Sequence, residues 1–214
     1  RDFSSLTKAG VSNRVETISA LKAICSEGLP MTIIRLDIKK FYQSVDTKQV
    51  LACATNGTKS TYALRRNLQH FITWSQDNVG GVPTGVSLSS SLAEYYLMEH
   101  LDARAISLHG VHFYRRYVDD IIMVCSSRRP PREYIEDLES ILPNELEFNS
   151  AADKRDVLEL HTPDQHGCFN YLGYNFSISK KLSSDKSNYR SVRLDIAPSK
   201  IAKRKARFVH SLLQ

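Results

Sequence analysis

The sequence lacks closely spaced cysteines. Its 214 residues include only four, none of which forms a Cys-X-X-Cys pair: Cys25, Cys53, Cys125 and Cys168. Structural zinc sites and small disulfide-bonded domains both rely on closely spaced cysteines. The spacing therefore predicts free thiols and a reducing, cytoplasmic location. A zinc site that combines Cys168 with His161 or His166 is the weaker alternative.

Long apolar runs are also missing. No stretch approaches the roughly 18 residues that a membrane-spanning helix needs, and the N-terminus has no signal-peptide pattern. The hydrophobic fraction of 42% suffices for one sizeable domain or two small ones. The net charge of +6 permits a nucleic-acid partner without requiring one. Because the chain starts at Arg1 and ends at Gln214 within a predicted helix, we expect it to be a piece of a longer protein.

Two adjacent carboxylates, Asp119 and Asp120, interrupt a stretch rich in β-forming residues. The flanking runs 111–117 and 121–125 predict a hairpin with the two aspartates at its tip. Paired negative charges repel each other and shift a pKa unless a cation lies near them. The arrangement favours a divalent metal ion, which prefers hard oxygen ligands. Taken alone, an Asp-Asp pair is more often part of a solvated turn.

Hydrophobic periodicity and turn residues predict the other elements. Helices are expected over 15–26, 46–54, 62–74, 87–108, 130–142 and from 198 onward, and strands over 31–36, 146–148, 157–160, 171–178 and 191–196. This order predicts an α+β fold, with a split βαβ antiparallel sheet and helices on one face. The first strand then lies beside the hairpin, so that Asp37 meets Asp119.

The three carboxylates Asp37, Asp119 and Asp120 would form a cluster with oxygen ligands only, which favours Mg²⁺ over zinc. Two such ions, about 3.5–4 Å apart, stabilise the attacking and leaving oxygens of a phosphoryl transfer. The residues themselves therefore predict a two-metal site for phosphoryl transfer.

Five segments of the chain resemble, in order, the palm motifs of reverse transcriptases: 36–46, 81–90, 117–120, 146–154 and 169–174. The Tyr-Val-Asp-Asp segment alone is a weak signal, whereas five motifs in series are a strong one. The bacterial retron, group II intron and abortive-infection (phage-defence) types are the most similar. The resemblance implies partial fingers over 1–30, a polymerase palm over 31–180 and the start of a thumb over 181–214.

The same resemblance implies a nucleotidyltransferase: an RNA-directed DNA polymerase that adds dNTPs to a primer 3′-hydroxyl. Its partners would be an RNA template with a DNA primer or an RNA–DNA duplex, and also a non-coding RNA or partner protein. Two Mg²⁺ ions, replaceable by Mn²⁺, would be held by Asp37, Asp119 and the backbone of Ile38, with Asp120 assisting. A role in antiviral defence against phage would follow from the abortive-infection likeness.

Further residues match positions that contact the nucleotide in that family. Tyr42 falls at an aromatic steric gate against a ribose 2′-hydroxyl, while Phe41 is expected to pack. The loop beside the nucleotide would comprise Pro83, Thr84 and Gly85. Thr84 stands where Gln is common and Glu94 where Asn is common, so side-chain contacts there depart from the family pattern.

Basic residues complete the expected site. Lys154 would lie near the triphosphate, and Arg14 is the candidate for a fingers arginine that grips it, because guanidinium binds phosphate in a bidentate way. Lys154 is equally typical of an ordinary surface lysine. Nucleic acid would contact the primer-grip turn and the basic terminal helix through Tyr171, Leu172, Gly173, Lys200, Lys203 and Arg207. The alternative for that helix is a solvated amphipathic face.

Other functions use similar carboxylate pairs. Template-independent DNA synthesis would need the same metal site, and a non-catalytic nucleic-acid-binding palm would keep the fold without the chemistry. A nucleotidyl cyclase is disfavoured by Tyr117 and by the primer-grip-like turn. An RNA-dependent RNA polymerase is disfavoured by Tyr42 and Tyr117.

Overall fold

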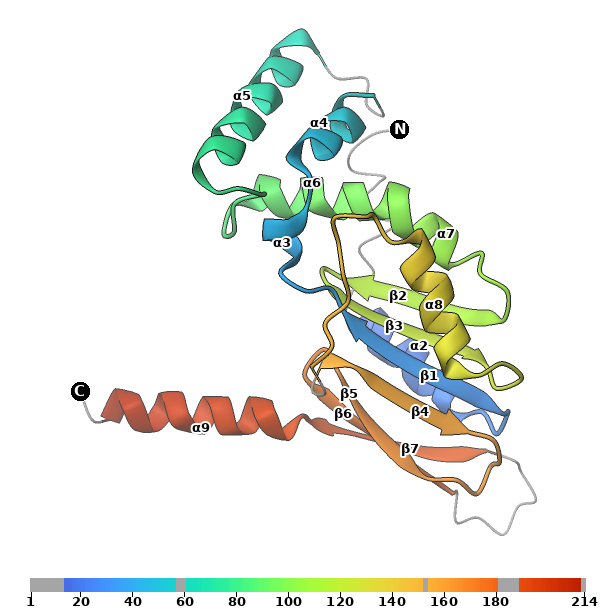
Figure 1. The fold of residues 1–214 in the computed structure, drawn as a ribbon. Coiled ribbons are helices and arrows are strands. Elements are labelled where there is room, and N and C mark those ends of the chain that lie inside the picture. Colours follow the sequence, from blue (N-terminus) through green and yellow to red (C-terminus); the bar gives the residue numbers. More distant parts are fainter. Residues whose placement is uncertain (1–13, 57–60, 152–153, 181–188, 213–214) are drawn as a thin grey trace.

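A computed structural model describes residues 14–56, 61–151, 154–180 and 189–212 (Figure 1). Most of the segment predicted as partial fingers, 1–13, lies outside these residues, as do residues 181–188 at the predicted start of the thumb. The predicted division into fingers, palm and thumb stays a prediction. In the described part of the chain, no helix is both long enough and apolar enough to span a membrane.

The central element is a four-stranded antiparallel sheet in the order β2-β3-β1-β4. Its strands are β1 (Met31–Asp37), β2 (Val111–Tyr117), β3 (Asp120–Ser126) and β4 (Asp156–Leu160). Asp37 at the end of β1 is the register partner of Asp120 at the start of β3. The first strand thus lies beside the hairpin, as the sequence predicts.

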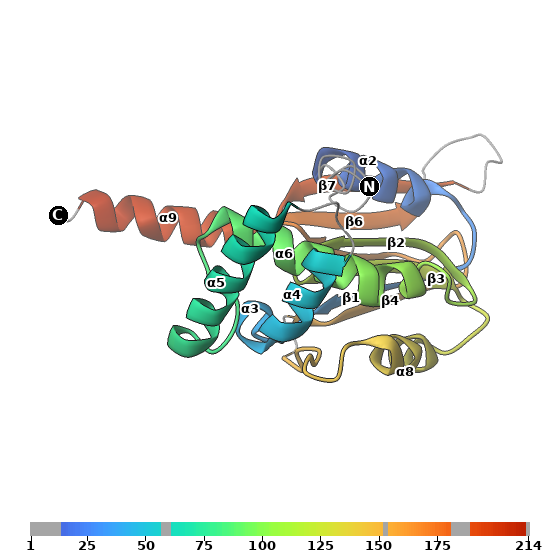
Figure 2. The ribbon, with the colours of Figure 1, turned by 90° about the horizontal axis from the view of Figure 1, so that it is seen from above.

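Strands β1 and β3 are buried on both faces, which explains why they are almost continuously apolar. Ile34 and Leu36 face a core built with helices, whereas Met31 and Ile33 face a second core. Complete burial of each such side chain stabilises the fold by about 1.5–3 kcal/mol. Figure 2 shows α8 (Pro131–Ile141) on one side of the sheet and α2 (Arg14–Ser26) on the other.

The helices between β1 and β2 are α3 (Phe41–Ser44), α4 (Thr47–Asn56), α5 (Tyr62–Asn78), α6 (Ser87–Leu97) and α7 (Ala103–Ala105). Asp46 caps α4 as predicted, since its carboxylate accepts a hydrogen bond of 2.8 Å from the Lys48 N–H. The single helix predicted over 87–108 contains a π-helical segment, η1 (Met98–Asp102). In Figure 1, α4 and α5 lie at the end of the molecule remote from the second sheet.

A second antiparallel sheet, ordered β5-β6-β7, packs together with α2 on the face of the four-stranded sheet that carries Met31 and Ile33. It consists of β5 (Gly167–Tyr171), β6 (Tyr174–Lys180) and β7 (Arg190–Ile196). The strand predicted over 171–178 is confirmed over 174–178 but begins too early, because Leu172 and Gly173 adopt φ angles of 48° and 80° and form a tight hairpin turn. The strand predicted over 146–148 is wrong: Phe148 makes only an isolated bridge with Ile38. The predicted α+β class with an antiparallel sheet is confirmed.

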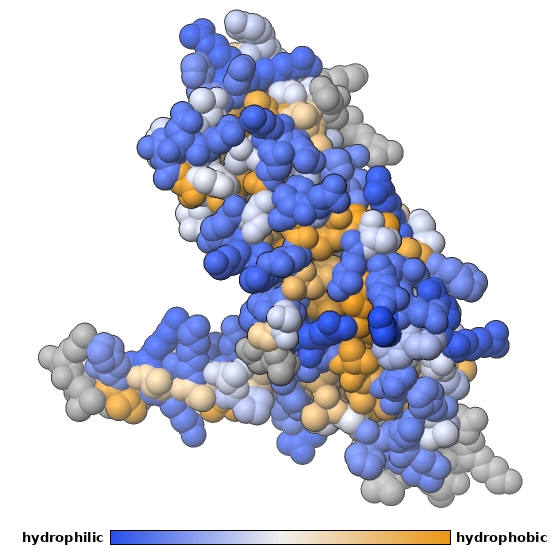
Figure 3. All heavy atoms as spheres, viewed as in Figure 1, coloured by the Kyte–Doolittle hydropathy of each residue, from blue (hydrophilic) through white to orange (hydrophobic). Residues whose placement is uncertain are grey.

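The last element, α9 (Pro198–Leu212), projects away from both sheets in Figures 1 and 2. Hydrophilic and hydrophobic residues alternate along it (Figure 3). Ile201, Phe208 and Val209 are exposed, as are the basic residues that the sequence assigned to nucleic-acid binding. The predicted terminal helix beginning at Pro198 is therefore confirmed, and its role stays a prediction.

The cysteines should differ sharply in reactivity. Burial raises the pKa of Cys25 and of Cys125 to about 12, whereas Cys168 is exposed. Because the thiolate is the reactive form, we expect Ellman's reagent at pH 8 to modify Cys168 in the folded protein and to spare Cys25 and Cys125. Mass spectrometry of the labelled peptides measures this, and unfolding in urea should make all of the thiols reactive. Rapid labelling of Cys25 in the native state would contradict the packing of α2.

Candidate active site

The site lies where β1 ends and the β2–β3 hairpin turns. Asp37 is the last residue of β1, and Asp119 sits in the turn between β2 and β3. The Ile38 N–H donates a hydrogen bond of 2.9 Å to the Asp119 carbonyl, which joins the two segments. Val118 adopts a φ of 59°, a strained value for a β-branched residue. Asp37 and Asp119 line one cavity of about 830 Å³.

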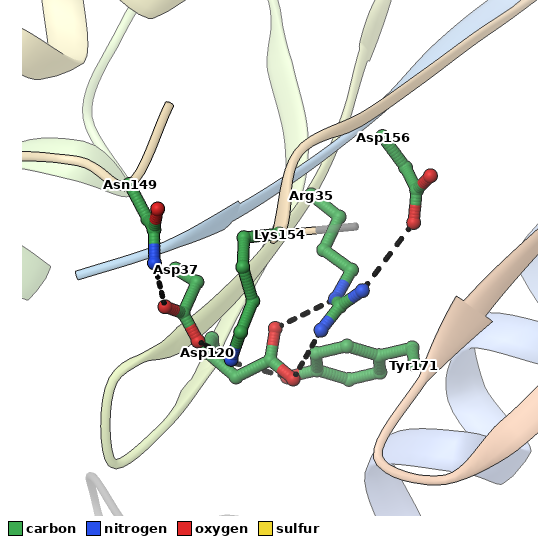
Figure 4. A network of polar contacts seen from close by, with 7 residues as sticks. All are labelled: Arg35, Asp37, Asp120, Asn149, Lys154, Asp156 and Tyr171. Atoms are coloured by element: carbon green, nitrogen blue, oxygen red, sulfur yellow. Dashed lines mark hydrogen bonds and ion pairs between the residues drawn. The ribbon is translucent and has the colours of Figure 1, made fainter. Parts of the chain in front are cut away.

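Asp37 is held on two sides. Its carboxylate accepts hydrogen bonds from Lys154 Nζ at 3.0 Å and from Asn149 Nδ2 at 3.4 Å (Figure 4). The Asn149 N–H also donates to the Asp37 carbonyl at 2.8 Å. The hydrogen bond to Asp37 raises the pKa of Lys154, so this lysine stays protonated at neutral pH. Lys154 thus lies at the site, where the resemblance placed it, and contacts Asp37 directly.

Asp119 occupies an environment that disfavours its charge. Burial raises its pKa, and the nearby charge of Asp37 adds to the effect. The charges of Lys154 and Arg116 act in the opposite direction. Two like charges kept together in a half-buried cavity are the usual setting for a cation.

Asp120 has a different partner. Arg35 donates to both of its carboxylate oxygens, at 2.9 Å and 3.2 Å, and to Asp156 at 3.4 Å (Figure 4). Tyr171 donates its hydroxyl to the Asp120 carbonyl at 3.4 Å. The sequence expected Asp120 to assist the metal; the structure pairs its carboxylate with Arg35, a role that the sequence did not suggest. A contribution of Asp120 to metal binding stays a prediction.

The donor set fits Mg²⁺. Asp37 and Asp119 supply oxygen ligands only, and Mg²⁺ at nucleotide sites is commonly bound by one or two carboxylates with water and substrate phosphates. The described residues contain no group of three or more His, Cys, Asp or Glu side chains arranged to hold a metal ion. In that part of the chain, this finding applies to the three-carboxylate cluster predicted from Asp37, Asp119 and Asp120 as well as to the zinc alternative around Cys168.

Tyr42 lines the same cavity as the two carboxylates. Burial raises its pKa, and the charges of Glu94 and Asp119 add to the effect. Its neighbour Phe41 is fully buried in the core, which confirms the predicted packing role. The loop residues behave differently: Thr84 and Gly85 are exposed, and none of Pro83, Thr84 and Gly85 is among the described residues that line this cavity.

The β5–β6 turn also lines the cavity. Leu172, Gly173 and Lys200 line it, while Lys203 and Arg207 lie further along α9 and outside it. Arg14, assigned from the sequence to the triphosphate, also lines the cavity. Its guanidinium donates to the Leu172 carbonyl and lies 5.3 Å from the centroid of the Tyr174 ring. The structure thus places Arg14 at the predicted primer-grip turn.

A buried arginine supports the hairpin from behind. The Arg116 side chain is 1% exposed and pairs with Asp102 and Glu94 at 2.8 Å each. It also donates a hydrogen bond of 2.7 Å to the Val118 carbonyl, next to Asp119. Tyr114 donates to Asp102 at 2.7 Å. This network ties the turn that carries Asp119 to α6 and η1.

Comparison with known proteins identifies the fold. The family model described as "Reverse transcriptase (RNA-dependent DNA polymerase)" matches residues 5–176. The chain belongs to the reverse transcriptase family. No curated protein matches its sequence.

Two solved structures share this reverse transcriptase fold. Apo telomerase from Candida tropicalis, truncated from its C-terminal domain, has a TM-score of 0.56 at 15% identity, over 90% of this chain and 43% of that one. Telomerase from Candida albicans, in complex with a fragment of telomeric RNA, has a TM-score of 0.51 at 14% identity, over 86% and 36%. The chain thus spans less than half the length of either structure, and at these identities the likeness shows the fold alone.

Proposed function

We propose that the chain carries the catalytic site of an RNA-directed DNA polymerase, which adds dNTPs to a primer 3′-hydroxyl. One observation supports this most strongly: Asp37 and Asp119, far apart in the sequence, line one cavity together with Tyr42 and the Leu172–Gly173 turn. Family membership and the RNA-bound telomerase of the same fold add support.

Asp37 and Asp119 are the metal ligands in this proposal, with the backbone of Ile38 beside them. When bound, Mg²⁺ supplies charge neutralisation on the triphosphate and activation of the primer hydroxyl. Asp120 acts through position, since Arg35 holds its carboxylate and thereby fixes the start of β3. Lys154, kept protonated by Asp37, serves as a proton donor to the departing pyrophosphate.

Different residues that line the cavity contact the incoming nucleotide and the primer. Tyr42 excludes the ribose 2′-hydroxyl of an incoming nucleotide, and Leu172 with Gly173 supports the primer end. Arg14 and Lys200 flank this turn and place positive charge where the primer backbone would run. The exposed basic side of α9 continues the same path, with Lys203 and Arg207. Pro83, Thr84 and Gly85 remain proposed as the loop beside the nucleotide and the template.

The proposal also includes the type of reverse transcriptase, its location and its biological role. The motif pattern favours a bacterial type related to retron, group II intron or abortive-infection enzymes, acting in the cytoplasm, with phage defence as its role. An associated non-coding RNA or partner protein is part of the same proposal.

Primer extension tests the proposed activity. The protein is assayed on an RNA template, on a DNA template and without template, with dNTPs or NTPs. We expect dNTP incorporation on RNA, and we expect Tyr42→Ala to raise NTP use relative to dNTP by about 10- to 100-fold because the pocket loses its steric barrier. Incorporation without template would favour template-independent synthesis. A wild-type protein that prefers NTPs would contradict the gate, and no incorporation at all would favour a non-catalytic scaffold.

A further inference from the structure

The main chain of Tyr42, the proposed gate residue, is held by a neighbouring segment as well as by its own short helix. Tyr42 lies in α3, which is only four residues long. The Val82 N–H donates a hydrogen bond of 2.8 Å to the Tyr42 carbonyl. Gly81 and Val82 are both buried. The segment before α6 thus packs directly on the backbone that carries the Tyr42 ring.

Gly81 makes this close approach feasible. A Cβ at position 81 would lie 2.6 Å from the Tyr42 carbonyl oxygen and 2.7 Å from the Gln43 carbonyl oxygen. Real Cβ atoms essentially never come within 3.0 Å of another heavy atom, and here the obstacle is backbone. Unlike Gly80 and Gly85, Gly81 does not have a positive φ, so glycine is needed there for space and not for conformation.

Gly81 is also held from its far side. The hydroxyl of Ser75, a fully buried residue of α5, donates a hydrogen bond to the Gly81 carbonyl. Gly81 is therefore clamped between α5 and α3. A side chain added at Gly81 must displace either this clamp or the main chain at Tyr42 and Gln43.

We propose that Gly81 is a positioning residue for sugar selectivity. Because Gly81 has no side chain, the 81–82 segment packs closely against the Tyr42 main chain. This contact sets how far the Tyr42 ring reaches into the cavity that Asp37 and Asp119 line. The hydrogen bond from Ser75 keeps the 81–82 segment in this position. The inference rests on the proposed function and deepens it: discrimination between deoxyribose and ribose depends on a buried glycine that does not itself touch the nucleotide.

The test measures the ratio of kcat/KM for an NTP to that for the matching dNTP. We expect Gly81→Ala to raise this ratio roughly 3- to 10-fold, since a displaced ring rejects the 2′-hydroxyl less well. Gly167→Ala is the matched control, because position 167 also lacks a positive φ but the three atoms nearest to its Cβ would belong to the Leu158 side chain rather than to backbone. Its ratio should equal the wild-type ratio.

A double substitution separates positioning from a general loss of structure. If Gly81 acts through Tyr42, Gly81→Ala should not change the ratio further in a Tyr42→Ala background. Ser75→Ala, which removes the clamp without adding volume, should raise the ratio in the same direction, and it decides the matter if Gly81→Ala does not fold.

Two outcomes would overturn the inference. If Gly81→Ala and Ser75→Ala lower kcat/KM equally for both nucleotides and leave the ratio unchanged, Gly81 is merely structural while the proposed polymerase stands. If the wild-type protein incorporates no nucleotide, the proposed function itself fails, and the inference fails with it.

Discussion

Asp119→Asn is expected to lower primer extension by at least about a thousandfold while leaving the chain folded. The substitution removes the charge of one of the two proposed metal ligands and replaces a carboxylate with a neutral amide. Asp37→Asn should have a similar effect on activity. Rates of dNTP incorporation at saturating primer–template and Mg²⁺ measure the loss.

The two substitutions should change the stability of the protein differently from its activity. The folded-state pKa of Asp119 is raised, chiefly by burial, so its ionised form costs free energy above the pKa of the unfolded chain. Removing the charge should therefore leave the free energy of unfolding at pH 7 unchanged or higher. Asp37→Asn instead weakens the ion pair with Lys154 and should cost a little. A stabilised but inactive Asp119→Asn protein would be typical of a functional site.

Asp120→Asn is the matched control for these variants. Its carboxylate already binds Arg35 at 2.9 Å, so we expect the loss of activity to be smaller than for either neighbour. An Asp119→Asn protein that keeps more than a tenth of wild-type activity would contradict the assignment of Asp119 as a metal ligand. Equal losses at Asp119 and Asp120 would instead give both carboxylates the same role.

Arg116→Met is expected to destabilise the fold by about 3–5 kcal/mol, the largest effect on stability that we predict. Arg116 is the shared partner of Asp102 and Glu94, and all three side chains are buried or nearly so. Without it, two carboxylates remain in the interior without a cation, and the Val118 carbonyl loses its donor. Urea denaturation at pH 7 measures the change.

The pH dependence gives this prediction a second readout. Burial already raises the pKa of Glu94, and Arg116 opposes that shift, so its removal should raise the pKa further. The deficit in stability should therefore shrink as the pH falls and Glu94 becomes protonated in the folded state.

Arg132→Met is the matched control, because Arg132 pairs with Glu136 on the exposed side of α8. It should change the stability by no more than about 0.5 kcal/mol. A loss below about 1 kcal/mol for Arg116→Met would contradict the network.

Local pattern in the sequence predicted the part of the site that depends on sheet register. The short apolar run over 31–36 predicts a buried strand, and a strand that ends at Asp37 beside the hairpin must bring Asp37 to Asp119. Hydrophobic pattern failed at Leu172 and Gly173, where only the motif resemblance indicated a turn. There a two-residue turn with left-handed backbone interrupts an otherwise continuous β pattern, and Leu is an uncommon residue for that conformation.

The side chains that position the site needed tertiary structure. Arg35 and Asp156 meet across neighbouring strands, and Arg116 reaches Glu94 over 22 residues. The period of two already places Arg35 on the same face as Asp37, a signal that could have suggested its pairing with Asp120. For Arg14, sequence reasoning suggested a partner that differs from the contact in the structure. Its charge alone suggested a phosphate ligand, whereas the packing of α2 places its guanidinium against the Leu172 carbonyl.

Whether Asp37 and Asp119 together hold a divalent metal ion can be measured without any polymerase activity. Mn²⁺ is titrated into the chain in the presence of dNTP, and bound ion is followed by electron paramagnetic resonance. We predict Mn²⁺ binding by the wild-type chain and by Asp156→Asn, beyond what dNTP alone binds, and its loss in the Asp37→Asn, Asp119→Asn double variant. Equal binding by the wild-type chain and the double variant would contradict the metal site.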